Sequence, residues 1–203
     1  MRDFWNQRYQ RPGYAYGTEP NFWVRQVAHA IPPGPVLCLA EGEGRNAVYL
    51  ATLGYEVTAM DLSEVGLAKA LALAKDRQVP LKTVVGDLAD FDLGDQRWSG
   101  VVAVTMHLPG ELRADLHSRI TNALAPGGVY VAEAYSPRHR SMPGIGGPKE
   151  GREDFFYSLP HVRSELGGLN LEHCQDIDRV VDEGPYHQGL SAVAQILARK
   201  PKE

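Results

Sequence analysis

The sequence predicts an α/β protein with a Rossmann-like, doubly wound and mostly parallel seven-stranded sheet that ends in an antiparallel hairpin. Short apolar runs alternate with helical patterns between residues 35 and 135, which is typical of parallel strands joined by right-handed helical crossovers. Gly- and Pro-rich turns separate these segments. The last two strand-like segments are joined by only a few residues, and so short a connection requires an antiparallel pair.

The first strand is expected over residues 35–40, because this nearly all-apolar run suits a strand that is buried on both faces. A helix over 45–53 follows and ends at a glycine. The second strand is expected over 55–60, and the serine at 63 offers an N-cap for a helix over 63–77. The further expected elements are strands over 81–85 and 99–106, a helix over 111–124, a turn over 125–128, a strand over 129–135, a loop over 138–152, a helix over 154–166, and strands over 171–183 and 189–200.

The length of 203 residues favours one domain, 1–203. Within it we expect N-terminal cover helices over 1–30, a cofactor-binding core over 35–135, and a substrate-side loop, helix and terminal hairpin over 136–203. The formal net charge of −4 argues against a nucleic-acid partner. No apolar run has the length of a membrane span or a signal peptide, which predicts a cytoplasmic protein. Two cysteines and scattered histidines predict neither a disulfide framework nor a metal site.

A glycine turn follows the first expected strand, at Gly42 and Gly44. Glycines there allow a tight turn and a close approach of a ligand, and the helix behind them directs free N–H groups at that ligand. Asp61 ends the second strand, 19 residues after Gly42 (61 − 42), where a carboxylate can accept both hydroxyls of a ribose. The alternative is that Asp61 only caps the next helix. Together these features favour a nucleoside cofactor.

Asp87 and Leu88 follow the third expected strand, at the sheet edge where an adenine base would lie. The carboxylate of Asp87 could accept a hydrogen bond from the adenine amine while Leu88 packs on the ring. A capped turn explains the same residues equally well.

An NAD-dependent oxidoreductase is one alternative, because residues 42–47 also satisfy the G-x-G-x-x-A dinucleotide pattern. Three observations count against it. The chain is short for a separate substrate domain, it lacks a Tyr-x-x-x-Lys pair near the fourth or fifth strand, and its strand plan ends in a hairpin.

Three segments resemble the class I S-adenosylmethionine-dependent methyltransferases: VLCLAEGEGRNAVYLATLGYEVTAMDLS (36–63), VVGDLADFDL (84–93) and LAPGGVYVAEAY (124–135). With the N-terminal stretch 4–24, the sequence is similar to the small bacterial enzymes of the tellurite-resistance and thiopurine methyltransferase group. The resemblance implies S-adenosyl-L-methionine as the cofactor. The cofactor-binding residues that it implies are Trp5, Tyr9, Tyr16, Gly17, Glu41, Gly42, Gly44, Asp61, Leu62, Asp87, Leu88, Met106 and His107.

The first motif departs from the family pattern at two positions. Cys38 stands where an acidic residue is usual, and Ala40 stands where the first glycine is usual. Glu41 is a candidate to replace the missing acidic group. These departures leave a non-catalytic S-adenosylmethionine-binding protein as a further alternative.

Methyl transfer from a sulfonium is an in-line displacement that depends on orientation and exclusion of water. A thiolate or chalcogen anion needs no general base, whereas a hydroxyl or amine acceptor does. His107 and His187 are the candidate catalytic residues, with a helix-capping or turn role as the alternative for each. We expect a small-molecule methyl acceptor, no nucleic-acid or membrane partner, and a monomer or homodimer.

Overall fold

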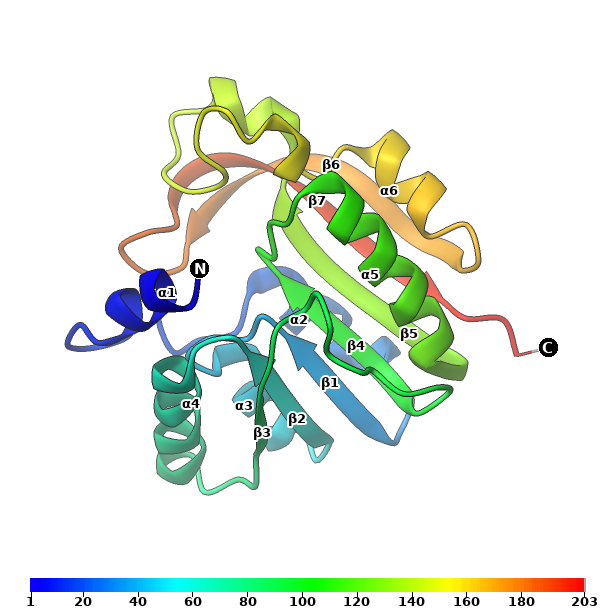
Figure 1. Cartoon of the computed structure of the whole chain (residues 1–203), viewed down its shortest axis with the longest axis horizontal. Helices are drawn as coiled ribbons and strands as arrows, with labels where there is room; N and C mark the ends of the chain where they lie inside the picture. The colour runs from blue at the N-terminus through cyan, green and yellow to red at the C-terminus, as the bar shows by residue number, and fades with distance from the viewer. Residues whose placement is uncertain (203) are drawn as a thin grey trace.

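The computed structural model describes residues 1–202 and confirms the predicted fold class: a seven-stranded, mostly parallel α/β sheet with antiparallel strands at one end (Figure 1). The strands are β1 (Pro35–Leu39), β2 (Glu56–Asp61), β3 (Lys82–Val85), β4 (Trp98–Val104), β5 (Leu124–Tyr135), β6 (Asn170–Asp182) and β7 (Gln188–Arg199). Their spatial order is β3-β2-β1-β4-β5-β7-β6.

Strands β1 to β5 are parallel, and β7 pairs antiparallel with both β5 and β6. The order in which strands are added to the sheet reverses between β1 and β4: β2 and β3 lie on one side of β1, whereas β4 and β5 lie on the other. In open α/β sheets, ligands bind beyond the carboxyl ends of the strands at such a switch point. This edge carries Ala40 to Gly44 after β1 and Thr105 to His107 after β4.

Helices cover both faces of the sheet. Helices α2 (Phe22–Val27), α3 (Arg45–Thr52) and α4 (Glu64–Asp76) lie on one face, with one apolar cluster beneath them. Helices α5 (Gly110–Ala123) and α6 (Leu159–Glu165) cover the other. The sheet is therefore apolar on both sides, in agreement with the apolar sequences of its central strands.

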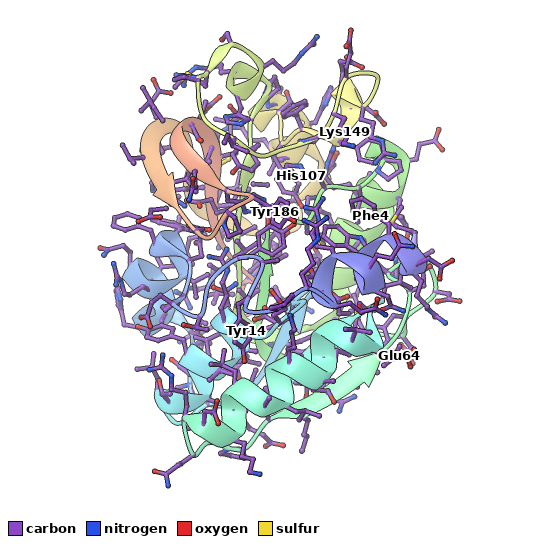
Figure 2. All side chains as sticks on the ribbon, turned by 90° about the vertical axis from the view of Figure 1, so that its left-hand side faces the viewer. Phe4, Tyr14, Glu64, His107, Lys149 and Tyr186 are labelled. Atoms are coloured by element: carbon purple, nitrogen blue, oxygen red, sulfur yellow. The ribbon has the colours of Figure 1, made fainter. Side chains whose placement is uncertain are left out.

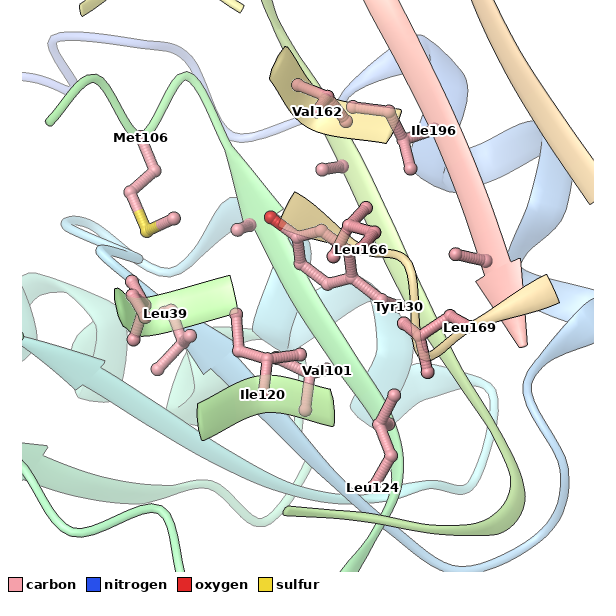
Figure 3. Close-up of a cluster of buried hydrophobic side chains, with 14 of the residues drawn as sticks. Leu39, Val101, Met106, Ile120, Leu124, Tyr130, Val162, Leu166, Leu169 and Ile196 are labelled. Atoms are coloured by element: carbon pink, nitrogen blue, oxygen red, sulfur yellow. The ribbon is translucent and has the colours of Figure 1, made fainter. Parts of the chain in front are cut away.

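The larger cluster fills the space between the sheet and helices α5 and α6 (Figure 3). Its labelled members include Leu39, Met106, Ile120, Tyr130 and Leu166, all of which are buried. The cluster fixes the end of β4 and the start of the segment that leads into α5. It thereby holds in place the backbone of residues 105–107 at the carboxyl edge.

Helix α1 (Arg2–Tyr9) lies apart from the two layers, at the carboxyl edge of the sheet, and packs against α4. Figure 1 shows α1 and the N-terminus between α4 and the turn that joins β6 to β7. Of the helices in residues 1–202, none has both the length and the apolar character that crossing a membrane requires.

The helix expected over 154–166 is the main local error. A short 3-10 helix covers Glu153–Phe155, and the α-helix begins only at Leu159. Between them the backbone N–H of Tyr157 donates to the carbonyl of Tyr135 at 3.0 Å. This bond ties the segment to the end of β5, so the helix cannot begin until Tyr157 has been passed. The turn expected over 125–128 is also wrong, because these residues belong to the start of β5.

Candidate active site

The glycine turn lies at the carboxyl end of β1, where the sequence places it. Gly42 has φ +62°, and a Cβ built on it would lie 2.5 Å from the phenolic oxygen of Tyr9. Gly44 has φ +90°, and its Cβ would lie 2.5 Å from Cβ of Ala70 in α4. Glycine at 42 therefore makes room for the side chain of Tyr9, and glycine at 44 allows the close packing of α3 on α4. The predicted role of Gly44 in binding a ligand is not required to explain it.

Ala40 adopts a left-handed conformation with φ +49°. This conformation is costly for a residue with a Cβ, and it explains why glycine is the usual residue at this place in the family pattern. The substitution therefore leaves the path of the turn unchanged. Cys38 lies fully buried in β1, where burial raises the pKa of its thiol well above the ordinary value.

The carboxylate of Glu41 caps the N-terminus of α3. Its Oε1 accepts hydrogen bonds from the backbone N–H groups of Asn46 and Ala47, at 2.9 and 2.8 Å. Burial nevertheless raises the pKa of this carboxyl to about 7, and the two N–H groups only partly oppose that shift. Glu41 is therefore poised between its neutral and ionised forms near neutral pH.

Asp61 at the end of β2 holds the two neighbouring turns together. Its Oδ2 accepts from the N–H of Gly42 at 2.9 Å, and its Oδ1 accepts from the N–H of Ser63 at 2.7 Å. Each oxygen keeps a second lone pair, so the carboxylate retains acceptor capacity for ribose hydroxyls. Burial raises its pKa, and these backbone bonds oppose the shift. Ser63 caps α4 through its own hydroxyl, which accepts from Gly66 at 3.1 Å. Leu62, between the two, is half-buried.

The N-terminal segment covers the glycine turn, as the resemblance implies. Tyr9 is 4% exposed and lies against both Gly42 and Gly66, where a Cβ would come within 3.0 Å of its ring. Trp5 stacks on Tyr9 with ring centroids 5.6 Å apart. Tyr16 meets Tyr9 edge-on at 6.4 Å. The aromatic cover is therefore one contiguous group.

Glu43 anchors this cover. One carboxylate oxygen accepts from the N–H of Ala15 at 2.7 Å, and the other accepts from Lys69 of α4 at 2.9 Å. Lys69 also donates to the carbonyls of Arg11 and Gly13. Glu43 thus fixes the loop that follows α1. The position of Glu43 between the two glycines of the motif does not predict this role.

Asp87 caps a turn, which is the alternative to adenine binding at this position: its Oδ1 accepts a hydrogen bond from the N–H of Ala89 at 3.0 Å. The side chain is exposed, and Leu88 is half-buried against the larger apolar cluster. Both residues therefore remain open to a ligand, and the adenine contact stays a prediction.

Met106 and His107 differ in what they expose. The side chain of Met106 is only 2% exposed and packs in the core, so this residue presents its backbone and not its side chain to the carboxyl edge. Nδ1 of His107 donates to the carbonyl of Phe155 at 3.0 Å, and Nε2 accepts from the N–H of Tyr135 at 3.4 Å. Burial lowers the pKa of His107 to about 4. Both ring nitrogens are engaged and the low pKa makes His107 a weak base at neutral pH, and its catalytic role stays a prediction.

His187 lies in the turn between β6 and β7, over the same edge. Its ring is 4.5 Å from that of Tyr16 and 5.4 Å from that of Tyr135. Its backbone N–H donates to the carbonyl of Gly184, as in a turn, while Nδ1 is buried and has no hydrogen-bond partner among residues 1–202. Burial, together with the charge of Arg45, lowers its pKa to about 3. Gly17, also predicted for the cover, lies beside the backbone of Gly184.

These segments meet in space although they are distant in sequence. Figure 2 looks at the molecule from the side of α1 and shows Phe4, Tyr14, His107 and Tyr186 on this one face, from three separate parts of the chain. Arg8 donates to the hydroxyl of Tyr16 at 2.8 Å and lies 4.2 Å from the ring centroid of Tyr186. The cover is therefore joined directly to the β6–β7 turn.

A cluster of buried charges beside this edge is not predicted by the sequence. Arg45 pairs with Glu183 at 2.6 Å, Arg179 pairs with Glu183 at 2.5 Å, and Arg179 also binds Glu133. Asn21 and Gln195 donate to the same carboxylates. Arg45 stands within the G-R-N-A continuation, but nothing in the sequence links it to a glutamate 138 residues away. Within residues 1–202, no three or more His, Cys, Asp or Glu side chains gather as a metal site.

Comparison with known proteins gives this geometry a class. Residues 36–128 match the family model described as a methyltransferase domain. Over 65 residues, 32% of the chain, it is 34% identical to hemagglutinin 1 of Eikenella corrodens, and that segment spans 22% of the hemagglutinin.

Solved structures share the fold over nearly the whole chain. A protein studied for the conversion of a disulfide bond into a thioacetal group during echinomycin biosynthesis superposes with a TM-score of 0.77 and 20% identity, over 100% of this chain and 93% of that one. TehB from Haemophilus influenzae gives 0.72 and 20%, over 98% and 66%. Magnesium protoporphyrin IX methyltransferase from Synechocystis PCC 6803, solved with bound SAH, gives 0.67 and 17%, over 98% and 97%.

Residues 36–128 match a methyltransferase domain. The strand order and the antiparallel β7 are shared with solved structures of S-adenosylmethionine-dependent methyltransferases, to which the fold is similar. The sheet that ends in a hairpin also separates it from the dinucleotide-binding alternative, whose fold continues with a second parallel half. The partly free carboxylate of Asp61 fits the ribose of a nucleoside donor.

Proposed function

We propose that this enzyme transfers the methyl group of S-adenosylmethionine to a small-molecule acceptor that is already nucleophilic when it binds. The observation that carries the proposal is the enclosure of the carboxyl edge by three segments. Tyr9 and Tyr16 cover it from the N-terminal side, His187 covers it from the hairpin, and His107 lies beyond β4. A polymer would need an open surface at this place, whereas a small acceptor does not.

The cofactor, when bound, supplies an activated methyl group on a sulfonium. Asp61 would bind the ribose, the turn at Gly42 would lie against the methionine part, and Asp87 with Leu88 would contact the adenine. The aromatic cover of Trp5, Tyr9 and Tyr16 would exclude water from the reacting atoms, which strengthens orientation and prevents hydrolysis.

The state of the two histidines supports an acceptor that needs no general base. Burial lowers the pKa of His107 to about 4 and that of His187 to about 3, so both are weak bases at neutral pH. A thiolate or chalcogen anion attacks without losing a proton in the same step, whereas a hydroxyl requires a stronger base. Thiols are therefore the first acceptors to test.

The test is methyl transfer from radiolabelled S-adenosylmethionine to a panel of small thiols, phenols and amines, with a protein and an RNA substrate in parallel. We expect turnover with thiols, no turnover with the polymers, and a rate that changes little between the wild type and His107→Asn. Turnover with amines or phenols that is lost in His107→Asn would contradict the proposal.

The donor site has its own test. Asp61→Ala removes a buried carboxylate that would accept charge-assisted hydrogen bonds, each of which contributes about 1.5–3 kcal/mol. We expect calorimetry to show a loss of S-adenosylhomocysteine affinity of about 10- to 100-fold. Asp92→Ala is the matched control, because Asp92 accepts from Gly94 in a similar turn on the surface. Equal affinity in the two variants would show that Asp61 does not hold the ribose.

A further inference from the structure

Two buried polar atoms beside the carboxyl edge have no hydrogen-bond partner in the part of the chain that the structure describes. They are Nη1 of Arg45 and Nδ1 of His187. The two residues are only 6% and 8% exposed. A buried donor without a partner lowers stability by about 1–3 kcal/mol, and such atoms in native proteins commonly face a ligand or a water molecule.

The two atoms belong to one neighbourhood. Nη2 of Arg45 is bound to Glu183 at 2.6 Å, and the N–H of Glu183 donates to the carbonyl of His187 at 2.9 Å. Glu183 therefore holds the guanidinium beside the turn that carries His187. The charge of Arg45 also helps to lower the pKa of His187, as expected of groups at short range.

Glu183 accepts a hydrogen bond from only one of the two terminal nitrogens of the Arg45 guanidinium. An arginine offers five N–H donors in a planar fork, and the fork matches the two oxygens of a carboxylate or another oxyanion. Nη1 still has its two N–H groups free. The imidazole of His187 is neutral, and its Nδ1 can carry the proton and donate. Together they offer donors, and positive charge, to one oxyanion.

The position of this pair in the sheet assigns the oxyanion to the acceptor. Asp61, the proposed ribose ligand, ends β2, whereas Tyr135, which contacts the His187 ring, ends β5. In the strand order these strands lie three spacings apart, roughly 14 Å. The rings of Tyr16 and Tyr135 flank His187 on this side and would pack on an apolar or aromatic body.

We propose that Nη1 of Arg45 and Nδ1 of His187 form the subsite that binds an oxyanion, such as a carboxylate, of the methyl acceptor. The inference rests on the proposed function, since it takes the acceptor to be a small molecule. Arg45 and His187 then select acidic acceptors and orient them without taking part in proton transfer.

The experiment measures binding and needs no turnover, so its outcome is independent of whether a methylated acceptor has been found. The protein is saturated with S-adenosylhomocysteine, and the affinities for benzoate and for its neutral analogue benzamide are measured by ligand-observed NMR. Acetate and acetamide provide a smaller pair. We expect at least about tenfold preference for one or both anions, as for a charge-assisted hydrogen bond.

The double variant Arg45→Gln/Glu183→Gln removes both charges of the pair and so avoids leaving one buried charge alone. We expect its preference for the anion to fall to within about twofold. His187→Phe retains a ring but loses Nδ1, and we expect a fall of at least about threefold. Arg138→Gln, which loses an exposed arginine paired with Asp176 and Asp178, is the control and should keep the wild-type preference.

A wild type that does not distinguish the anions from the amides overturns the proposal, as does a double variant with unchanged preference. The donor also carries a carboxylate, and a second measurement separates this source. If the double variant binds S-adenosylhomocysteine about tenfold more weakly and 5′-methylthioadenosine normally, Arg45 binds the donor's carboxylate, and the assignment to the acceptor is wrong.

Discussion

The two halves of the carboxyl edge are built in different ways. On the donor side, Glu41 and Asp61 are held by backbone N–H groups that lie within 19 residues of them in sequence. On the hairpin side, Glu133 and Glu183 are held by side chains from α3, β6 and β7. Backbone groups depend on the path of a short segment, whereas a charge cluster exists only when distant elements have packed. The donor side is therefore a local structure and the hairpin side a tertiary one.

The largest expected loss of stability comes from a substitution in the charge cluster on the hairpin side. Glu183→Gln leaves Arg45 and Arg179 with one carboxylate fewer, and removing one partner of a buried ion pair destabilises by about 3–5 kcal/mol. Despite burial, the two arginines hold the pKa of Glu183 at about 2, so the wild-type carboxylate is charged at neutral pH. Urea denaturation measures the change.

Glu172→Gln is the control for that variant. Glu172 lies in β6, the strand that ends one residue before Glu183, but it pairs with Arg199 at the surface, and exposed pairs contribute about 0–1 kcal/mol. Equal losses in the two variants would show that the buried cluster does not stabilise the fold more than a surface pair does.

The next effect concerns the donor side and depends on pH. Burial raises the pKa of Glu41 to about 7, above the value of about 4.5 in the unfolded chain. Below pH 4.5 the carboxyl is protonated in both states, and between pH 4.5 and 7 only the unfolded state ionises. Stability from this residue is thus present at low pH and is lost as pH rises to about 7, by up to about 3 kcal/mol.

The difference in stability between the wild type and Glu41→Gln isolates this contribution, because Gln keeps an acceptor for Asn46 and Ala47 but cannot ionise. We expect the variant to gain relative to the wild type as pH rises from 4.5 to 7 and to show no further gain above pH 8. A difference that does not vary with pH would mean that Glu41 ionises normally in the folded state.

The smallest expected change in stability comes from Ala40→Gly and tests whether the donor side is a local structure. Ala40 has φ +49°, and glycine adopts this conformation without a steric penalty. We expect Ala40→Gly to raise stability by about 0.5–1 kcal/mol and to leave S-adenosylhomocysteine affinity unchanged. Ala51→Gly in the regular helix α3 is the opposite control and should destabilise by a similar amount. A destabilising Ala40→Gly would show that chain entropy outweighs the strain.

The same division explains how much could be predicted. The strands and the ends of helices α3, α4 and α5 follow from apolar runs and caps, and they agree with the structure to within a few residues. The helix expected over 154–166 was misplaced because a hydrogen bond from Tyr157 to Tyr135 decides where it begins. The hydrogen bonds of His107 could not be predicted from the sequence, because its partners, Phe155 and Tyr135, come from other elements. Its catalytic role stays a prediction.

The sequence by itself determined the fold class, the glycine turn at Gly42 and the acidic residue Asp61 that ends the second strand. These depend on periodicity and on short spacing, which a chain carries in its order of residues. Only the tertiary structure decided that Glu43 anchors the cover, that Gly44 serves helix packing, and that Arg45 meets Glu183. Burial and long-range pairing set these roles, because the protonation state and the partners of a side chain depend on what packs around it.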